Sequence, residues 1–319
     1  MDVFGPVRSR RLGNSLGVNH LPPKTCTYSC VYCQLGRTSF MTTNRARFSD
    51  PKDIHAKIAS RLAELKKENV AVDTIAFVSN GEPTLDRSLG EMLQQARAFG
   101  IQTAVITNAS LLWHPDTARQ MMHADVVSLK VDTVNEATWH KLDRPHGTLN
   151  LDTVFNGMHR FAQFYKGTLM TETMLIDGVN DSEEEARANA VFIADLNPAT
   201  AYIALPLRPP AESWVKPSRP ENLTRVYKIF KEHIPHVEIL MDLPETEFLS
   251  KDGLAENLLR TLRVHPLTRE EVESHLKESG ESIALIEQLL AEEGIQSFHF
   301  RGSEFLVSSY KADTSEADA

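Results

Sequence analysis

Residues 25–37 read TCTYSCVYCQLGR, and they contain all three cysteines of the 319-residue chain. Cys26, Cys30 and Cys33 follow the spacing C-x3-C-x2-C. An odd number of cysteines this closely spaced is not a disulfide framework, and a reducing cytosol would not maintain one. Three thiolates are one ligand short of a structural zinc site, but they can hold a four-iron cluster and leave one iron open. The stretch therefore indicates an iron–sulfur centre that can chelate a small molecule.

The first 244 residues alternate between apolar runs and amphipathic stretches. Repeated strand–helix order predicts an α/β fold whose parallel sheet has right-handed crossovers, as a partly closed β/α barrel or an open doubly wound sheet. Both arrangements place ligand groups at the C-terminal ends of the strands. The predicted strands are 15–21, 74–80, 102–108, 125–132, 167–176 and 200–207. The first predicted helix begins at Asp50, and the other predicted helices span 84–99, 114–124, 151–165, 182–196 and 219–233.

Polar side chains gather at the ends of these strands and on one face of them. In the stretch 125–132 polar and apolar residues alternate, so the apolar face would meet the helices and the polar face would look inward. For the charged residues, an internal salt-bridge network and a contact with substrate are both open interpretations. The candidates are Gly81, Glu82, Pro83, Thr107 and Asn108 near strand ends, with Lys130, Asp132, Glu172 and Arg208 as candidate catalytic residues.

The cysteine spacing, with Tyr32 directly before the last cysteine, resembles the signature of the radical S-adenosylmethionine (radical SAM) superfamily. The resemblance extends over about residues 5–240, because 80–83 and 106–108 match segments that bind the cofactor in that family. It implies a partial (β/α)6 barrel of the TIM type. It also implies a [4Fe–4S] cluster on the three cysteines and S-adenosylmethionine on the open iron. The implied cofactor contacts are Tyr32, Gly81, Glu82, Pro83, Thr107 and Asn108, with the segment at Glu82 on the methionine amino group and Asn108 on the ribose.

Within the superfamily, residues 5–13 (GPVRSRRLG) and 33–37 (CQLGR) resemble a group of prokaryotic Fe–S oxidoreductases that are similar to the wyosine tRNA-modifying synthetase. That synthetase carries a second cluster on additional cysteines, and this sequence has no further cysteine for one. An alternative interpretation of the cysteine motif is a zinc site with His20 or His55 as the fourth ligand.

Charge is distributed unevenly along the chain. Residues 1–244 carry 27 basic and 27 acidic side chains, and residues 245–319 carry 7 and 16, so the net charge of −9 belongs to the C-terminal quarter. The first 47 residues have a net charge of +6, which suits an anionic cofactor or substrate as well as a solvated basic face.

The C-terminal region shows three helical patterns, the second opened by a capping box at Thr268, and then a β-hairpin. This order resembles a winged helix-turn-helix domain. The expected recognition helix, SIALIEQLLAEEG, has no basic residue, so we do not expect duplex DNA as a partner. We divide the chain into a barrel at 1–244, a winged-helix-like domain at 245–310 and a disordered tail at 311–319.

Two functions remain open at this stage. The first is a radical SAM enzyme in which reductive cleavage of S-adenosylmethionine yields a 5′-deoxyadenosyl radical that abstracts hydrogen from an unidentified tRNA base, protein, peptide or small molecule. A flavodoxin or ferredoxin would serve as reductant. The second is an Fe–S redox-sensing regulator with a winged-helix output domain. We expect a cytoplasmic protein without a membrane segment, because no window approaches the roughly 18 apolar residues of a membrane helix.

Overall fold

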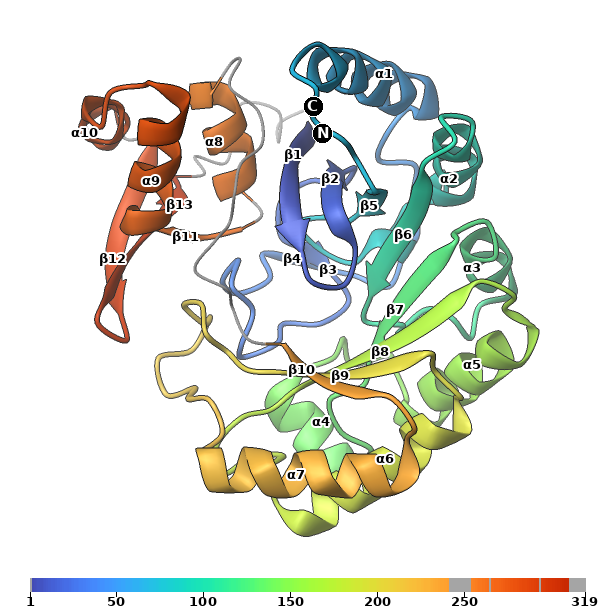
Figure 1. Ribbon diagram of the computed structural model, residues 1–319. Helices are drawn as coiled ribbons and strands as arrows, with labels where there is room; N and C mark the ends of the chain where they lie inside the picture. The colour runs from blue at the N-terminus through green and yellow to red at the C-terminus, as the bar shows by residue number, and fades with distance from the viewer. Residues whose placement is uncertain (1, 241–253, 264, 293, 310–319) are drawn as a thin grey trace.

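The computed structural model describes residues 2–240, 254–263, 265–292 and 294–309. In these residues the chain forms a large α/β unit, followed by a smaller C-terminal unit of three helices and a three-stranded sheet (Figure 1). The predicted boundary near residue 244 and the predicted tail at 311–319 lie outside the described residues.

The large unit is built on a curved sheet with the order β1-β2-β5-β6-β7-β8-β9-β10. β1 pairs antiparallel with β2, and the later neighbours all pair parallel. This mixed α/β fold with a parallel sheet is consistent with a partial TIM-type barrel. The strands are β1 (Asp2–Ser9), β2 (Gly13–Asn19), β5 (Thr74–Phe77), β6 (Gln102–Thr107), β7 (Val126–Lys130), β8 (Thr168–Met174), β9 (Thr200–Ala204) and β10 (Val237–Leu240).

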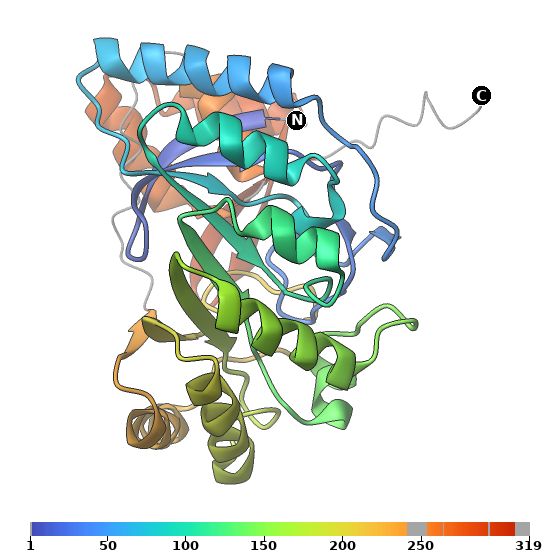
Figure 2. The same cartoon turned by 90° about the vertical axis from the view of Figure 1, so that its right-hand side faces the viewer.

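Helices cover the outer face of this sheet (Figures 1 and 2). Side chains cap several of them: Asp50 accepts a hydrogen bond from the Lys52 amide, and Ser182 accepts one from the Glu185 amide. These side chains pair amide groups that a helix start leaves without an intrahelical partner. The helices are α1 (Pro51–Lys67), α2 (Leu89–Arg97), α3 (Pro115–Met121), α4 (Glu136–Leu142), α5 (Leu151–Phe164), α6 (Glu183–Asp195) and α7 (Pro220–His233).

The two faces of the strands differ as the alternating pattern predicts. Val127 and Leu129 of β7 are fully buried in the core that joins the sheet to the helices. Lys130 of the same strand instead lines the interior cavity. The outer face therefore contributes packing, and the inner face is available for polar chemistry.

The C-terminal unit follows the order that the sequence predicts. α8 (Leu254–Leu262), α9 (Arg269–Ser279) and α10 (Ala284–Ala291) pack with a sheet of order β11-β13-β12, formed by β11 (Leu267–Thr268), β12 (Ile295–Phe300) and β13 (Ser303–Ser308). The capping box between Thr268 and Glu271 is present. An apolar core of its own, including Leu258, Leu276 and Leu306, holds the unit together.

All six predicted strands are present, but most end two or three residues early. The predicted helix 84–99 is wrong in its first part: Pro83–Leu85 is a 3-10 turn, and α2 begins only at Leu89. The Glu82 carboxylate accepts from the Thr84 amide and the Asp86 carboxylate from the Ser88 amide, so these two side chains hold a turn in place of the first helical turn. The edge strands β1 and β10 and the short helix α4 were not predicted.

Across the described parts of the chain, we find no helix with the length and apolar character that crossing a membrane requires.

Candidate active site

A cavity of about 480 Å³ lies inside the sheet, toward the C-terminal ends of its strands. Its wall includes all three cysteines, which lie in the segment between β2 and α1. On the inner face of the sheet it includes Lys130 and Glu172. The cysteine motif and the predicted polar strand residues, far apart in sequence, therefore share one cavity.

Backbone hydrogen bonds fix the cysteine loop from two sides. The Val31 amide donates to the Leu142 carbonyl at 2.9 Å, and the Val31 carbonyl accepts from the Glu212 amide at 3.0 Å. The Glu212 carboxylate also binds Arg37 through two hydrogen bonds and pairs with Arg144. The loop is thus clamped between the end of α4 and the segment after β9, which fixes the directions of its thiols.

Gly81 permits the close approach of the loop to the end of β5. A Cβ atom at this position would lie 1.8 Å from the Thr25 carbonyl oxygen. The same carbonyl accepts a hydrogen bond from the Glu82 amide at 3.1 Å. A side chain at position 81 would therefore push apart the two segments that frame the cavity.

Glu82 is buried, and its carboxylate collects donors from two strand ends. Its Oε1 accepts from the Thr84 amide at 3.0 Å, the Thr84 hydroxyl at 2.6 Å and the Thr107 hydroxyl at 2.5 Å. Its Oε2 accepts from the Asn108 amide at 2.8 Å. Burial raises the pKa of Glu82, while these hydrogen bonds oppose the rise. Since Oε2 has a single protein donor among these contacts, it has the capacity for one more from a ligand.

Asn108 joins the end of β6 to the cysteine loop. Its side-chain amide donates to the Thr27 hydroxyl at 2.8 Å and to the Cys26 sulfur at 3.7 Å. Hydrogen bonds to cluster sulfurs are among the features that set a cluster's reduction potential. The side chain predicted to contact a ribose therefore also contacts a cysteine sulfur.

The three thiols have the chemistry that an iron–sulfur cluster requires. Burial raises the pKa of Cys26 to about 12 and the pKa of Cys30 well above its usual range, so both hold their protons until a metal displaces them. In the described residues no three His, Cys, Asp or Glu side chains converge on a single ion. A cluster binds each thiolate through a different iron, so its ligands need not meet at one point. The cysteines therefore fit a cluster.

Neither alternative zinc ligand lines the cavity that holds the cysteines. The His20 ring contacts the Ser79 hydroxyl at 2.9 Å and the Pro83 carbonyl at 3.2 Å through its two nitrogens. The His55 ring stacks on Phe99, with the ring centroids 4.7 Å apart. Neither histidine completes a metal site with the cysteines.

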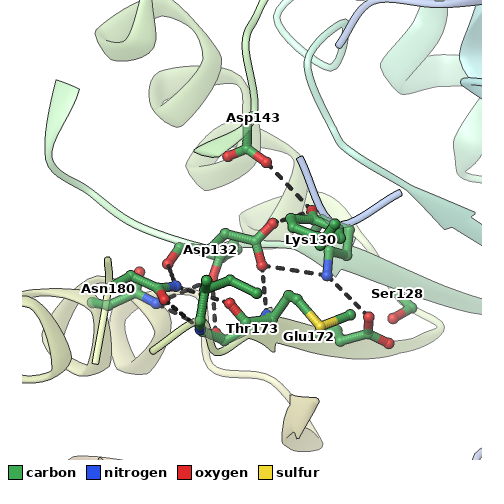
Figure 3. Close-up of polar contacts among 12 residues, drawn as sticks. Ser128, Lys130, Asp132, Asp143, Glu172, Thr173 and Asn180 are labelled. Carbon is green, nitrogen blue, oxygen red and sulfur yellow. Dashed lines mark hydrogen bonds and ion pairs between the residues drawn. The ribbon is translucent and has the colours of Figure 1, made fainter. Parts of the chain in front are cut away.

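A chain of charged side chains crosses the inner face of the sheet (Figure 3). Lys130 Nζ lies 3.0 Å from Glu172 and 3.3 Å from Asp132, and Arg11 pairs with the other oxygen of Glu172. Burial alone would raise the pKa of Glu172, but the charges of Arg11 and Lys130 outweigh it and lower the pKa to about 2. Burial would lower the pKa of Lys130, but Asp132 and Glu172 outweigh it and raise the pKa. Lys130 and Glu172 are therefore both charged at neutral pH.

Tyr32 connects this network to the cysteine loop. Its hydroxyl donates to Asp132 and lies 3.3 Å from Asp143, and Lys130 Nζ lies 4.8 Å from its ring centroid. Burial, together with the charge of Asp132, raises the pKa of Asp143 well above its usual range. The aromatic ring next to Cys33 is thus oriented by side chains of β7 and the adjoining segment.

Arg208 is directed toward the C-terminal unit. Its guanidinium donates to the Pro266 carbonyl and lies 3.9 Å from the Glu271 carboxylate. Arg208 also lines the cavity, together with His265.

The structure thus brings most of the predicted site residues to one cavity. Pro83 and Asp132 are buried but do not line that cavity: Pro83 begins the 3-10 turn, and Asp132 lies behind Lys130. Thr107 lines the cavity, but its hydroxyl donates a hydrogen bond to Glu82. Sequence reasoning did not single out Arg11, Glu212 or His265 as site residues. Arg11 was visible only as part of the basic N-terminal stretch, and no sequence signal marks the other two.

Comparisons with known proteins give a consistent result. The family model described as the radical SAM superfamily matches residues 21–190. A UPF0026 protein of Methanocaldococcus jannaschii is 38% identical over 97% of both chains. A radical SAM methyltransferase of Sphaerobacter thermophilus has a similar fold, with a TM-score of 0.56 and 16% identity over 71% of this chain and 65% of its own. SuiB of Streptococcus suis bound to S-adenosylmethionine also has a similar fold, with a TM-score of 0.51 and 15% identity over 72% of this chain and 52% of its own.

Proposed function

This chain belongs to the radical SAM superfamily, and we propose that Cys26, Cys30 and Cys33 are the ligands of its [4Fe–4S] cluster. The protein is a radical SAM enzyme, and its cofactors are that cluster and S-adenosylmethionine. When bound and reduced by one electron, they supply cleavage of S-adenosylmethionine to methionine and a 5′-deoxyadenosyl radical that takes hydrogen from the substrate. The observation that carries the ligand assignment is that all three thiols line one cavity with Glu82 and Asn108.

The residues around the cysteines have separate tasks in this proposal. Glu82 receives the cofactor's amino group at Oε2, because its other oxygen is already satisfied by protein donors. Gly81 lets the Glu82 segment lie against the cysteine loop, and Thr107 holds the Glu82 carboxylate. Asn108 reaches the ribose while it donates to Cys26, and Tyr32 covers the cluster side of the cavity. Pro83 contributes by ending the strand segment in a fixed turn.

The four charged candidates mainly position other residues. Lys130 and Arg11 pair with Glu172, Lys130 also pairs with Asp132, and Asp132 accepts from the Tyr32 hydroxyl, so these charges position one another and Tyr32. Arg208 holds the C-terminal unit. This favours the salt-bridge interpretation over direct catalysis for the network.

We further propose that the large unit extends through about residue 244 and that the C-terminal unit is winged-helix-like. Its element order, with the hairpin β12–β13 after α10, supports that assignment. α10 carries no basic residue, so duplex DNA is not its partner. The substrate is a protein, a peptide, an RNA or a small molecule, and the electron comes from a flavodoxin or ferredoxin.

Cluster loading tests the ligand assignment. We expect Cys30→Ala to lose most of the iron that wild-type protein retains after anaerobic reconstitution with iron and sulfide. Ser29→Ala is the matched control, because it changes the same loop and leaves the thiols in place. Equal iron content and an unchanged cluster absorption spectrum in Cys30→Ala would refute the assignment.

A further inference from the structure

The C-terminal unit lies beside β1, where the sheet is open between its edge strands β1 and β10 (Figure 1). α8 packs against β1. Arg263, directly after α8, pairs with Asp2 of β1 at 2.9 Å. The C-terminal unit therefore lies at the side of the large unit that the helices of the large unit leave uncovered.

Two side chains of the large unit fasten Arg263 and Pro266, which lie between α8 and β11. Arg208, which follows β9, donates to the Pro266 carbonyl. Asn80, 5% exposed, donates from Nδ2 to the Arg263 carbonyl at 3.1 Å. Its Oδ1 accepts from the Lys24 amide at 3.1 Å, just before the cysteine motif. One amide side chain thus connects the cysteine loop and the Gly81–Glu82 segment to the C-terminal unit.

The segment held by these two side chains reaches the cavity through His265. His265 lines the same cavity as the three cysteines, in a wall that also includes Leu205, Leu207 and Leu240. Burial, and then the charge of Arg208, lowers the pKa of His265 well below its usual range, so its ring is neutral at physiological pH. This wall of the cavity therefore presents aliphatic surface and an uncharged hydrogen-bonding ring, beside the guanidinium of Arg208, which donates to the Pro266 carbonyl.

We propose that the C-terminal unit is a wall of the reaction cavity, with His265 as its cavity-facing residue and Asn80 as the positioning residue that fastens it to the cofactor segment. The inference rests on the proposed function and goes beyond it, because the unit then belongs to the active site and is more than a recruiting module. The chemistry of the wall fits a largely apolar part of the substrate that carries a hydrogen-bonding group.

Thiol labelling at position 265 tests the proposal. In cluster-loaded protein the native cysteines are metal-bound, so we would measure the reaction of His265→Cys with N-ethylmaleimide by mass spectrometry, with and without S-adenosylmethionine. Arg260→Cys is the matched control, because Arg260 lies on α8 in a pair with Glu256 at the protein surface. We expect the thiol introduced at position 265 to react more slowly than the one at position 260, and S-adenosylmethionine to slow only the former.

The Asn80→Asp variant tests the fastening. Aspartate keeps an acceptor for the Lys24 amide but loses the donor to the Arg263 carbonyl. We expect labelling at position 265 to rise about fivefold when Asn80→Asp is added to His265→Cys, as the loss of one hydrogen bond predicts. Labelling at position 260 should stay constant when the same change is added to Arg260→Cys.

Each outcome decides a separate question. Labelling at position 265 that is as fast as at position 260, or indifferent to bound cofactor, would overturn the assignment of His265 to the cavity. An unchanged rate in Asn80→Asp would overturn the role of Asn80. Absence of S-adenosylmethionine binding in equilibrium dialysis would contradict the proposed function instead, and the Asn80→Asp comparison in unliganded protein would still decide whether the wall is fastened.

Discussion

The cysteine side and the opposite side of the cavity are held by different kinds of contact. Around the cysteines, besides the ion pairs of Glu212 with two arginines, backbone groups and small residues meet at close range, as at Gly81 and the Thr25 carbonyl. Opposite, long charged side chains such as Arg11, Lys130 and Glu172 bridge separate strands. Backbone contacts fix positions tightly and tolerate little change. Charge pairs adapt more readily. We therefore expect a substitution on the cysteine side to abolish binding of the cluster and the cofactor, and a substitution on the opposite side only to lower the stability of the fold.

Gly81→Ala should disrupt the packing on the cysteine side of the cavity more than the other variants do. The added Cβ would meet the Thr25 carbonyl at 1.8 Å, so the loop or the strand end must move. We expect loss of both cluster retention and S-adenosylmethionine binding, measured by iron content and equilibrium dialysis. Gly147→Ala is the control, because a Cβ there meets no atom within 4 Å. Normal iron retention in Gly81→Ala would contradict the tight contact.

Glu172→Gln probes the opposite side. It leaves Arg11 and Lys130 with one compensating charge fewer in a buried site, which should lower the free energy of unfolding by about 3 kcal/mol. Denaturant unfolding of the cluster-free protein measures this. Glu91→Gln, which affects an exposed pair with Arg47, should cost less than about 1 kcal/mol. Equal costs for the two variants would show that the buried network contributes no more than a surface pair.

The cost of Glu172→Gln should depend on pH. The folded pKa of Glu172, about 2, lies below its ordinary value of 4.5, so its charge stabilises the fold above pH 4.5 and this contribution is lost as pH falls toward 2. The difference in unfolding free energy between wild type and variant should therefore be constant near neutrality and shrink below pH 4.5. A difference that stays constant through this range would argue against a charged Glu172.

Tyr32→Phe should have the smallest effect, although Tyr32 links the two sides. The variant keeps the ring beside Cys33 and removes the hydroxyl that binds Asp132. We expect a loss of about 1 kcal/mol in unfolding free energy, with cluster content retained. Loss of the cluster would show that the hydroxyl, and not the ring, positions the loop.

The contrast between the two sides also explains what the sequence could reveal. Cys26, Cys30, Cys33 and Glu82 lie in short contiguous motifs, so the sequence could single them out, and they line one cavity; their roles stay predictions that the family resemblance implies. The alternation in β7 predicted that Lys130 faces inward, but not which partners it meets.

The missed residues owe their positions to tertiary contacts. His265 reaches the cavity only because the C-terminal unit packs on β1, and Glu212 acquires its role through two arginines far from it in sequence. The edge strand β10 is four residues long, too short for a clear apolar period. Such features depend on the assembled fold and leave no local signal.

In the function proposed above, this cavity carries out radical chemistry on S-adenosylmethionine. The most direct test is to reconstitute the cluster anaerobically, add S-adenosylmethionine and dithionite, and quantify 5′-deoxyadenosine against Cys30→Ala. We predict product in the wild-type reaction well above that variant. A loaded four-iron cluster that binds and reduces normally but forms no more product than Cys30→Ala would contradict the account and favour a redox-sensing role.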